Sequence, residues 1–214
     1  MSDPTDFIRA NTALVSPPLV PEIKLHLATE VVPLWRLTEE ELQAQGIPPP
    51  YWAFAWAGGQ ALARYVLDHP KSVAGKDVLD FGSGSGLVAI AAAKAGAMRI
   101  MAADIDPYAY AAIKLNAIAN TAILGATMSD VLGSDGNWRV ILVGDMCYER
   151  PLAEQMLAWL IDRAKHGATV LIGDPGRSYF PKGGVEKLSS YQVKTTRDLE
   201  DQEIRQTSVY KLIA

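Results

Sequence analysis

Short apolar runs alternate along most of the chain with longer segments whose apolar residues have helical spacing. The runs predict strands at 77–81, 99–103, 123–127, 139–143 and 168–172. The segments between them predict helices at 59–67, 87–97, 107–119 and 149–165. Pro151 and Gly167 suit the beginning and the end of the last of these helices. The pattern is that of repeated β-α units.

Such alternation is typical of an α/β fold with a mostly parallel sheet and helices on both faces. Two further β segments, 191–195 and 207–213, are close enough in sequence to pair antiparallel at the C-terminal end. We therefore predict a Rossmann-like, seven-stranded, mostly parallel sheet that ends in an antiparallel strand pair. Sheets of this kind bind ligands beyond the carboxyl ends of their strands, so the site should follow the first, second and fourth strands.

The first 57 residues are expected to form an N-terminal extension and lid on one compact domain spanning 58–214. Residues 22–35 partly alternate apolar and polar positions, which suggests a hairpin or edge strand interrupted by Pro33. Thr38 precedes three glutamates and predicts a capped helical turn. Residues 47–59 mix prolines and aromatics and should form a packed loop. With 214 residues, of which 49% are hydrophobic, the chain can bury one sizeable core.

The charge and cysteine content narrow the function. A net charge of −4 provides no sequence-wide basic field, which disfavours nucleic acid as a substrate. The single cysteine, Cys147, cannot form an intramolecular disulfide or a multi-cysteine metal cluster. The N-terminus has neither the apolar run of a signal peptide nor the arginine-rich character of a transit peptide. We expect a cytoplasmic protein without a metal site or a membrane span.

A glycine-rich turn joins the first predicted strand to its helix. Asp80 lies near the end of the strand, and glycines follow at positions 82, 84 and 86. A dinucleotide-binding G-x-G-x-x-G would need a glycine at position 87, where the chain has Leu87. Alternating glycines let the backbone turn sharply and approach a ligand that carries an amino-acid group rather than a pyrophosphate.

The segment VLDFGSGSG at 78–86 resembles the first motif of class I methyltransferases, whose glycine loop lies under the methionine part of S-adenosylmethionine. The resemblance implies that Asp80 helps hold the ammonium of this ligand, directly or through water. It also implies that Asp104 accepts hydrogen bonds from the two ribose hydroxyls, a task that suits a carboxylate. Asp130 could reach the adenine amino group or could be a simple loop acid. The residues predicted to bind S-adenosylmethionine are Trp56, Asp80, Gly82, Ser83, Gly84, Gly86, Asp104, Ile105, Asp130 and Gly144.

The segment GDMCYERP at 144–151 follows the fourth strand, on the edge that faces the sulfonium methyl in class I enzymes. Met146 and Cys147 replace both prolines of the motif that grips planar amide or adenine nitrogens. Asp145 and Tyr148 instead match an acid-x-x-aromatic pattern that is similar to the one in seven-β-strand protein lysine methyltransferases.

A lysine must lose its proton before its nitrogen can attack a methyl group, and its reference pKa of ~10.4 makes this uphill near neutrality. We expect Asp145 to orient the amine and Tyr148 to line its channel. Asp145 could instead cap the following helix, and Tyr148 could simply pack in the core. Carbon-5 pyrimidine methyltransferases place a nucleophilic cysteine after this strand, but the absence of a preceding proline favours a buried, inert Cys147.

Five segments together look like the electron-transfer-flavoprotein β-subunit lysine methyltransferase family: PYWAFAWAGGQALARYVLDHP, VLDFGSGSGLVAIAAAKAGA, ADIDPYAYAAIKLNA, ILVGDMCYE and LIGDPGR. The resemblance spans roughly residues 50–177. It implies N-methylation of lysines on that flavoprotein subunit, with ribosomal proteins as an alternative protein substrate, and the N-terminus favours a bacterial member.

The same cofactor motif is compatible with a small-molecule methyltransferase and with a non-catalytic S-adenosylmethionine-binding protein. We expect Trp56 to cover the cofactor, with Gln60 nearby, although this N-terminal lid could instead pack on the sheet without contacting the ligand. Arg177 is expected either to meet the protein substrate or to be solvated in a turn.

Overall fold

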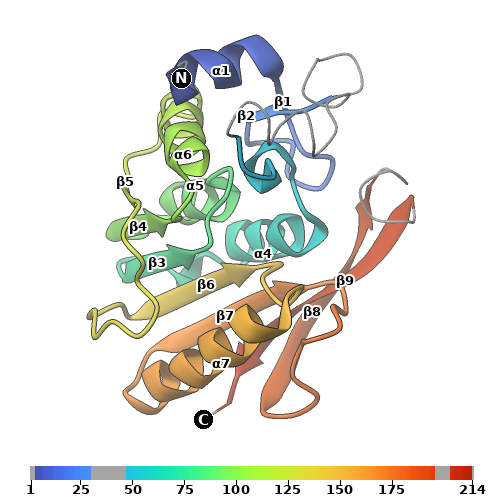
Figure 1. The fold of residues 1–214 in the computed structure, drawn as a ribbon. Coiled ribbons are helices and arrows are strands. Elements are labelled where there is room, and N and C mark those ends of the chain that lie inside the picture. The colour runs from blue at the N-terminus through green and yellow to red at the C-terminus, as the bar shows by residue number, and fades with distance from the viewer. Residues whose placement is uncertain (1–2, 30–46, 196–202, 214) are drawn as a thin grey trace.

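The computed structural model describes residues 3–29, 47–195 and 203–213. Its centre is a seven-stranded sheet with the strand order β5-β4-β3-β6-β7-β9-β8 (Figure 1). The strands from β5 to β7 pair in parallel, whereas β9 runs antiparallel to both β7 and β8. This confirms the predicted sheet and its antiparallel C-terminal pair. The strands are β3 Asp77–Phe81, β4 Arg99–Ala103, β5 Gly125–Thr127, β6 Val140–Gly144, β7 Thr169–Asp174, β8 Val185–Lys194 and β9 Ile204–Leu212.

Helices cover both faces of the sheet (Figure 1). The long helices are α4 Ala57–Asp68, α5 Leu87–Lys94, α6 Pro107–Ala119 and α7 Arg150–Lys165, and a short 3-10 turn, η2, spans Pro70–Ser72. In β6, Leu142 packs with the α4 and α5 side chains, whereas Ile141 packs with those of α7. Because successive strand residues point to opposite faces, a strand buried on both sides needs the continuous apolar run that β6 has.

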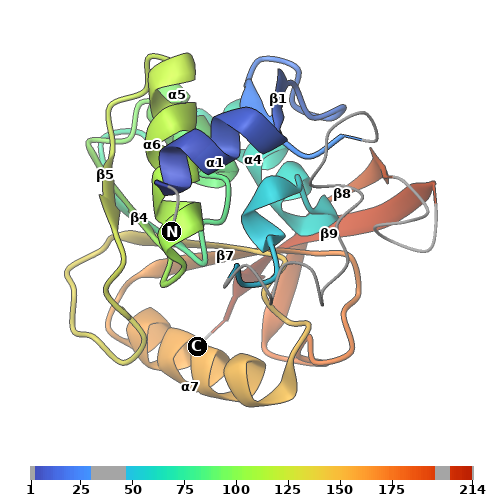
Figure 2. The same cartoon turned by 45° about the horizontal axis from the view of Figure 1, so that its top comes forward.

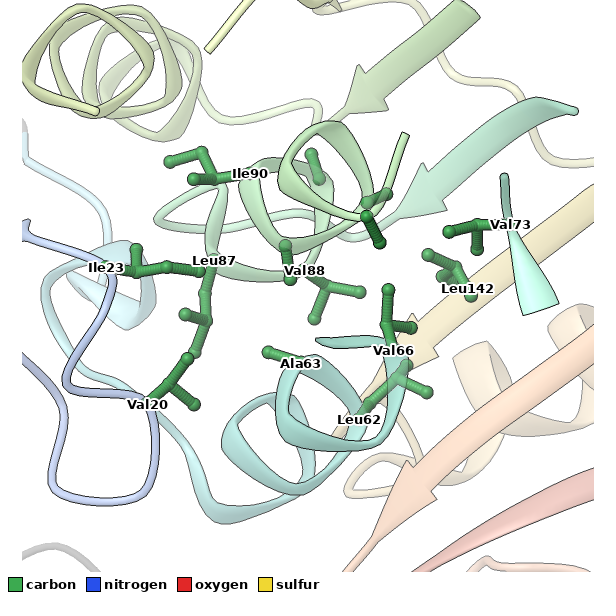
Figure 3. Close-up of a cluster of buried hydrophobic side chains, with 14 of the residues drawn as sticks. Val20, Ile23, Leu62, Ala63, Val66, Val73, Leu87, Val88, Ile90 and Leu142 are labelled. Atoms are coloured by element: carbon green, nitrogen blue, oxygen red, sulfur yellow. The ribbon is translucent and has the colours of Figure 1, made fainter. Parts of the chain in front are cut away.

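The larger core cluster joins α4 and α5 to the sheet. Figure 3 shows Val66 of α4 and Val88 of α5 directed into one apolar space beside Leu142 of β6. Val20 and Ile23 of the N-terminal segment complete the cluster on the Leu87 side, and both are fully buried. The described part of the N-terminal segment is thus packed into the same core as the sheet.

The N-terminal segment contains elements that the apolar pattern does not predict. Helix α1 spans Pro4–Asn11 and is capped by Asp3, whose carboxylate accepts a 2.7 Å hydrogen bond from the backbone N–H of Thr5. Strand β1 Ala13–Val15 pairs antiparallel with β2 Leu25–Leu27. The predicted extended segment at 22–35 therefore contains a strand, but its partner lies earlier in the chain. The predicted helical turn at 38–41 falls outside the described residues.

Side chains of α6 hold this N-terminal segment in place. The amide oxygen of Asn116 accepts from the backbone of His26 at 2.8 Å, and that of Asn120 accepts from the backbone of Lys24 at 3.0 Å. Helix α1 lies across α6, where the rings of Phe7 and Tyr108 meet edge to face with centroids 5.4 Å apart (Figure 2). These contacts fix the extension on the helix that begins directly after the end of β4.

Candidate active site

A cavity of about 530 Å³ lies at the carboxyl ends of β3, β4 and β6, the edge of the sheet that the sequence predicts for the site. The loop after β5 and residues 48–56 complete its wall. The cavity brings together both predicted catalytic residues, Asp145 and Tyr148. The predicted cofactor residues that line it are Trp56, Gly82, Gly84, Asp104, Ile105, Asp130 and Gly144, while Asp80, Ser83 and Gly86 do not.

The loop between β3 and α5 requires glycines because its backbone has positive φ angles and passes close to other residues. Gly82, Gly84 and Gly86 have φ values of 62°, 53° and 82°, in the left-handed region that side chains disfavour. A Cβ on Gly82 would lie 2.5 Å from the sulfur of Met146, another residue of the cavity wall. The loop thus presents bare backbone to the cavity while passing close to the residues after β6.

Asp80 supports the glycine loop from the protein interior. Its side chain is buried, and Oδ2 accepts hydrogen bonds from Ser83 Oγ at 2.5 Å and from the backbone N–H of Ala89 at 2.9 Å. Burial raises the pKa of Asp80 to about 7 against the lowering effect of these two bonds. Asp80 therefore ties the loop to the first turn of α5. Its predicted contact with a ligand ammonium stays a prediction, and in this geometry the contact would have to pass through water.

Asp104 presents a fixed carboxylate at the end of β4. Oδ2 accepts from the backbone of Gly84 at 2.8 Å, and Oδ1 accepts from the backbone of Asp106 at 3.1 Å. Burial raises the pKa of Asp104 above its ordinary range. Each carboxylate oxygen has a further lone pair that can accept from a hydroxyl group. The neighbouring Ile105 is 71% exposed on the cavity wall, and Asp130 faces the same space while accepting from the backbone of Leu132 at 2.9 Å.

The 3-10 helix η1, Tyr51–Ala53, supplies cavity residues that the sequence reasoning missed. Trp52 is 1% exposed, and its ring is nearly parallel to that of Tyr108 with centroids 6.3 Å apart. Within the described ranges, no group accepts a hydrogen bond from the indole Nε1 of Trp52. The proline-aromatic composition of residues 47–59 was a signal of packing, but it did not reveal that a cavity-lining tryptophan has a buried indole N–H without an acceptor among the described residues.

Asp145 is held in a strained backbone conformation directly after β6. Its φ is 62°, which is uncommon for a residue with a side chain. Oδ2 accepts from the backbone N–H of Gly58 at 2.8 Å, and Oδ1 accepts from Nε of Arg177 at 2.6 Å. The side chain is 3% exposed. Asp145 does cap a helix, but the helix is α4, so the alternative interpretation of Asp145 as a cap for the following helix, α7, is wrong.

Two close glycine contacts join α4 to the edge of the sheet. A Cβ on Gly58 would lie 2.3 Å from the carbonyl oxygen of Gly173, and a Cβ on Gly173 would lie 2.1 Å from that of Gly58. The backbone N–H of Asp145 also donates to the Gly173 oxygen at 2.9 Å. The three segments WAGGQ, GDMCY and GDPGR, which are far apart in sequence, therefore form one structural unit at the cavity.

Arg177 is ion-paired rather than solvated, so the expectation of a solvated side chain is wrong. Its side chain is 19% exposed, and its guanidinium carbon lies 5.9 Å from the centre of the Trp56 ring. Asp174 Oδ1 fixes the turn by accepting from the backbone of Gly176 at 2.6 Å and from that of Arg177 at 2.8 Å. Burial raises the pKa of Asp174 to about 6.

Aromatic rings line the cavity around this ion pair. Tyr51 lies between Trp56 and Tyr148, with ring centroids 6.1 Å and 5.7 Å away. Tyr148 is 43% exposed, so simple core packing does not describe it. Gln60, expected near the cofactor, does not line the cavity, because its amide bonds to the backbones of Leu19 and Ala55.

Cys147 is fully buried, and burial raises the pKa of its thiol to about 12, assisted by the charges of Asp174 and Asp145. A thiol in this state is inert, as expected from the sequence. The described part of the chain contains no group of histidine, cysteine and acidic side chains that could hold a metal ion. No helix in the described ranges is long and apolar enough to cross a membrane.

Known proteins similar to this chain share most of its length. It is 40% identical over 214 residues to the electron transfer flavoprotein beta subunit lysine methyltransferase of Xenopus laevis, covering 97% of this chain and 86% of that protein. It is 43% identical over 178 residues to the human protein of the same name, covering 81% and 67%. The chain belongs to the electron transfer flavoprotein beta subunit lysine methyltransferase family.

Further comparisons give one family-model match over part of the chain and a shared fold. The family model Ribosomal protein L11 methyltransferase (PrmA) matches residues 61–139, which include the glycine loop and Asp104. Among solved structures, a putative RNA methyltransferase from Pyrococcus horikoshii has a TM-score of 0.54 at 13% identity, covering 73% of this chain and 83% of that one. A putative methyltransferase complexed with SAH has a TM-score of 0.52 at 15% identity, covering 73% and 50%. These two structural likenesses show a shared fold.

Proposed function

We propose that this methyltransferase uses S-adenosylmethionine to methylate lysine side chains of the electron transfer flavoprotein beta subunit. The observation that carries this proposal is that one cavity joins the bare glycine loop and Asp104 to the cluster of Asp145, Tyr148 and Arg177. The names of the relatives, which match over most of the chain, support the protein substrate.

The residues at the sheet edge fit this cofactor. The cavity volume of about 530 Å³ is within the ordinary range of small-molecule sites. Gly82 and Gly84 leave backbone open to a close ligand, and Asp104 has acceptor capacity beyond its two backbone bonds. Trp52 Nε1 is a buried donor that a ligand oxygen could satisfy. When bound, S-adenosylmethionine supplies an activated methyl group on a sulfonium.

The substrate end of the cavity suits a long aliphatic side chain that ends in an amine. Tyr51, Trp56 and Tyr148 offer aromatic surface to methylene groups. Asp145 lies at the cavity wall with both oxygens already engaged, each by one donor. A neutral amine can still donate to a remaining lone pair of this carboxylate, which directs the nitrogen lone pair away from Asp145. We propose this orienting role for Asp145 and a channel-lining role for Tyr148.

Mass spectrometry of purified electron transfer flavoprotein and ribosomal proteins tests the proposal. Each is incubated with the protein and S-adenosylmethionine, and mass increments of about 14 Da per methyl group are assigned to lysines by peptide mapping. We expect increments on the flavoprotein beta subunit alone. The Asp104→Ala variant is the matched control, and with S-adenosylmethionine kept scarce it should modify the same lysines more slowly.

Two different results would change the assignment. Increments confined to ribosomal proteins would replace the flavoprotein as substrate, a candidate that the family-model match over residues 61–139 favours. Cofactor binding without transfer to either protein would contradict the proposed substrate class and favour a small-molecule acceptor or a non-catalytic role.

A further inference from the structure

The substrate end of the cavity carries a fixed positive charge. Four aspartates, Asp104, Asp106, Asp130 and Asp145, line the cavity, and Arg177 is the cationic residue among the described lining residues. Arg177 donates from Nε to Asp145 at 2.6 Å, and its guanidinium group lies over the Trp56 ring. The Arg177 cation thus lies against the Asp145 carboxylate and the Trp56 ring. A lysine ammonium would otherwise be stabilised at this position.

Arg177 is held there by its backbone as well as by its side chain. The Asp174 carboxylate accepts from the backbone of Gly176 and of Arg177, and Asp174 is itself buried. A guanidinium group keeps its proton throughout the physiological pH range. Because the pair with Asp145 has little solvent around it, the charges of the two groups are only weakly screened.

An incoming lysine therefore meets a compensated carboxylate. An unpaired Asp145 carboxylate would attract the lysine ammonium and raise the pKa of the lysine. When Asp145 is paired with Arg177, the pair carries little net charge, and Arg177 repels a second cation. We propose that Arg177 is a positioning residue that neutralises Asp145, so that the substrate lysine is bound as the free amine. This inference rests on the proposed function, since it concerns the amine that the proposed reaction uses.

Other titratable groups lie around this ion pair or elsewhere on the cavity wall. Burial raises the pKa of Asp106 and of Asp174 to about 6, so both are ionised above neutrality. The pKa of Cys147 is raised to about 12, and burial also raises that of Tyr148, so both keep their protons at pH 9. Between pH 7 and 9 these four groups keep their charge, unlike a bound lysine. The remaining groups are Tyr51, Asp104, Asp130, Asp145 and Glu149.

The pH dependence of kcat on the flavoprotein tests the proposal, with Arg177→Gln as the key variant. The rising limb of the pH profile should move upward by about one to two pH units, because the uncompensated charge of Asp145 then acts on the amine. At pH 7 kcat should fall about 10-fold or more while KM stays the same or falls. The rate should recover toward wild type near pH 9.5. A merely structural loss would lower kcat equally at every pH.

Three further variants isolate the charge. Arg177→Lys keeps a cation and should keep the wild-type limb, and adding Asp145→Asn to Arg177→Gln should move the limb back. Arg150→Gln is the matched control, since Arg150 lies at the start of α7 against Tyr179, outside the cavity wall, and should leave the limb in place. The proposal is overturned if the rising limb of the kcat–pH profile does not move in Arg177→Gln, or if it moves equally in Arg150→Gln.

A wild-type measurement covers the case in which Arg177→Gln does not fold. With S-adenosylhomocysteine present, calorimetric affinity for the flavoprotein should rise between pH 7 and 9 relative to a flavoprotein whose mapped target lysine is replaced by methionine. A relative affinity that instead rises as pH falls overturns the proposal. If wild-type enzyme methylates no flavoprotein lysine at any pH, the proposed function has failed, and the role of Arg177 falls with it.

Discussion

At the scale of single residues, Asp104 is the acceptor whose loss should act on cofactor binding most directly. In Asp104→Ala the ribose hydroxyls lose their predicted carboxylate, and the backbone N–H of Gly84 loses its partner. We expect calorimetric affinity for S-adenosylhomocysteine to fall by about 30-fold, or about 2 kcal/mol. The control is Asp162→Ala, an acid on α7 that does not line the cavity. Equal affinities in Asp104→Ala and wild type would remove Asp104 from the binding site.

Trp52 should contribute one hydrogen bond to the same ligand. Its Nε1 has no acceptor within the described residues, and Trp52→Phe removes this donor while keeping an aromatic ring against Tyr108. We expect affinity for S-adenosylhomocysteine to fall about 3- to 10-fold, the effect of a neutral hydrogen bond. The matched control is Trp138→Phe, because Trp138 packs against Trp159 outside the cavity. A loss of the same size in both variants would indicate a general packing effect.

Individual site residues were predictable where a local motif carries the signal. The glycine loop and Asp104 follow two adjacent strand ends, so the sequence places them at one edge of the sheet, and the structure does the same. Asp80 belongs to the same motif, but the motif does not show that Ser83 and Ala89 hold its side chain buried away from the cavity. Trp52 and the pairing of Asp145 with Arg177 depend on contacts between distant segments, which no local pattern contains.

At the scale of elements, the beginning of α4 should tolerate a methyl group at one glycine and not at its neighbour. Gly58→Ala would place a Cβ 2.3 Å from the Gly173 oxygen, whereas the nearest atom to a Cβ on Gly59 is Leu87 Cδ2 at 4.0 Å. We expect Gly58→Ala to lose about 2–3 kcal/mol of stability, seen as a melting temperature roughly 5–10 °C lower. Gly59→Ala should be neutral or stabilising by up to about 1 kcal/mol.

The rate of methyl transfer provides a second measurement on Gly58→Ala and Gly59→Ala. Because the backbone of Gly58 donates to Asp145, Gly58→Ala should also lower kcat, while Gly59→Ala should retain it. Gly58→Ala with wild-type stability and turnover would show that α4 can shift freely at the sheet edge, against the close contact seen here.

Element prediction succeeded for repeated units with strong periodicity. Strand β3 and helix α6 have the expected bounds, since turn residues and proline mark their ends. Helix α4 begins two residues before the predicted 59, because its first turn is capped by Asp145 from a distant strand end. Helix α1 was missed, as was strand β1, which pairs with the β2 segment of the predicted extended region. They are short, and long-range contacts with α6 contribute to holding them in place.

At the scale of the whole molecule, acids buried around the cavity should make the ligand-free protein less stable as pH rises toward neutrality. Burial raises the pKa of Asp80 to about 7, and those of Asp106 and Asp174 to about 6. A carboxyl group whose pKa is higher in the folded than in the unfolded state favours folding below about pH 4, and loses that contribution as pH rises through the folded-state pKa. We expect the melting temperature to be roughly 5–10 °C lower at pH 7.5 than at pH 5.

Two variants on one strand decide whether buried acids cause this slope. Asp80→Asn removes the most buried of the three and should flatten the fall between pH 5 and 7.5. Asp77→Asn is the matched control, because the hydrogen bond from Arg99 lowers the pKa of Asp77, so that its stabilising effect is lost only below about pH 4. The slope above pH 5 should therefore persist in Asp77→Asn. A melting temperature that rises from pH 5 to 7.5 in wild type would contradict the assignment. Because S-adenosylhomocysteine is expected to bind the folded protein and not the unfolded chain, a saturating concentration should raise the melting temperature at every pH.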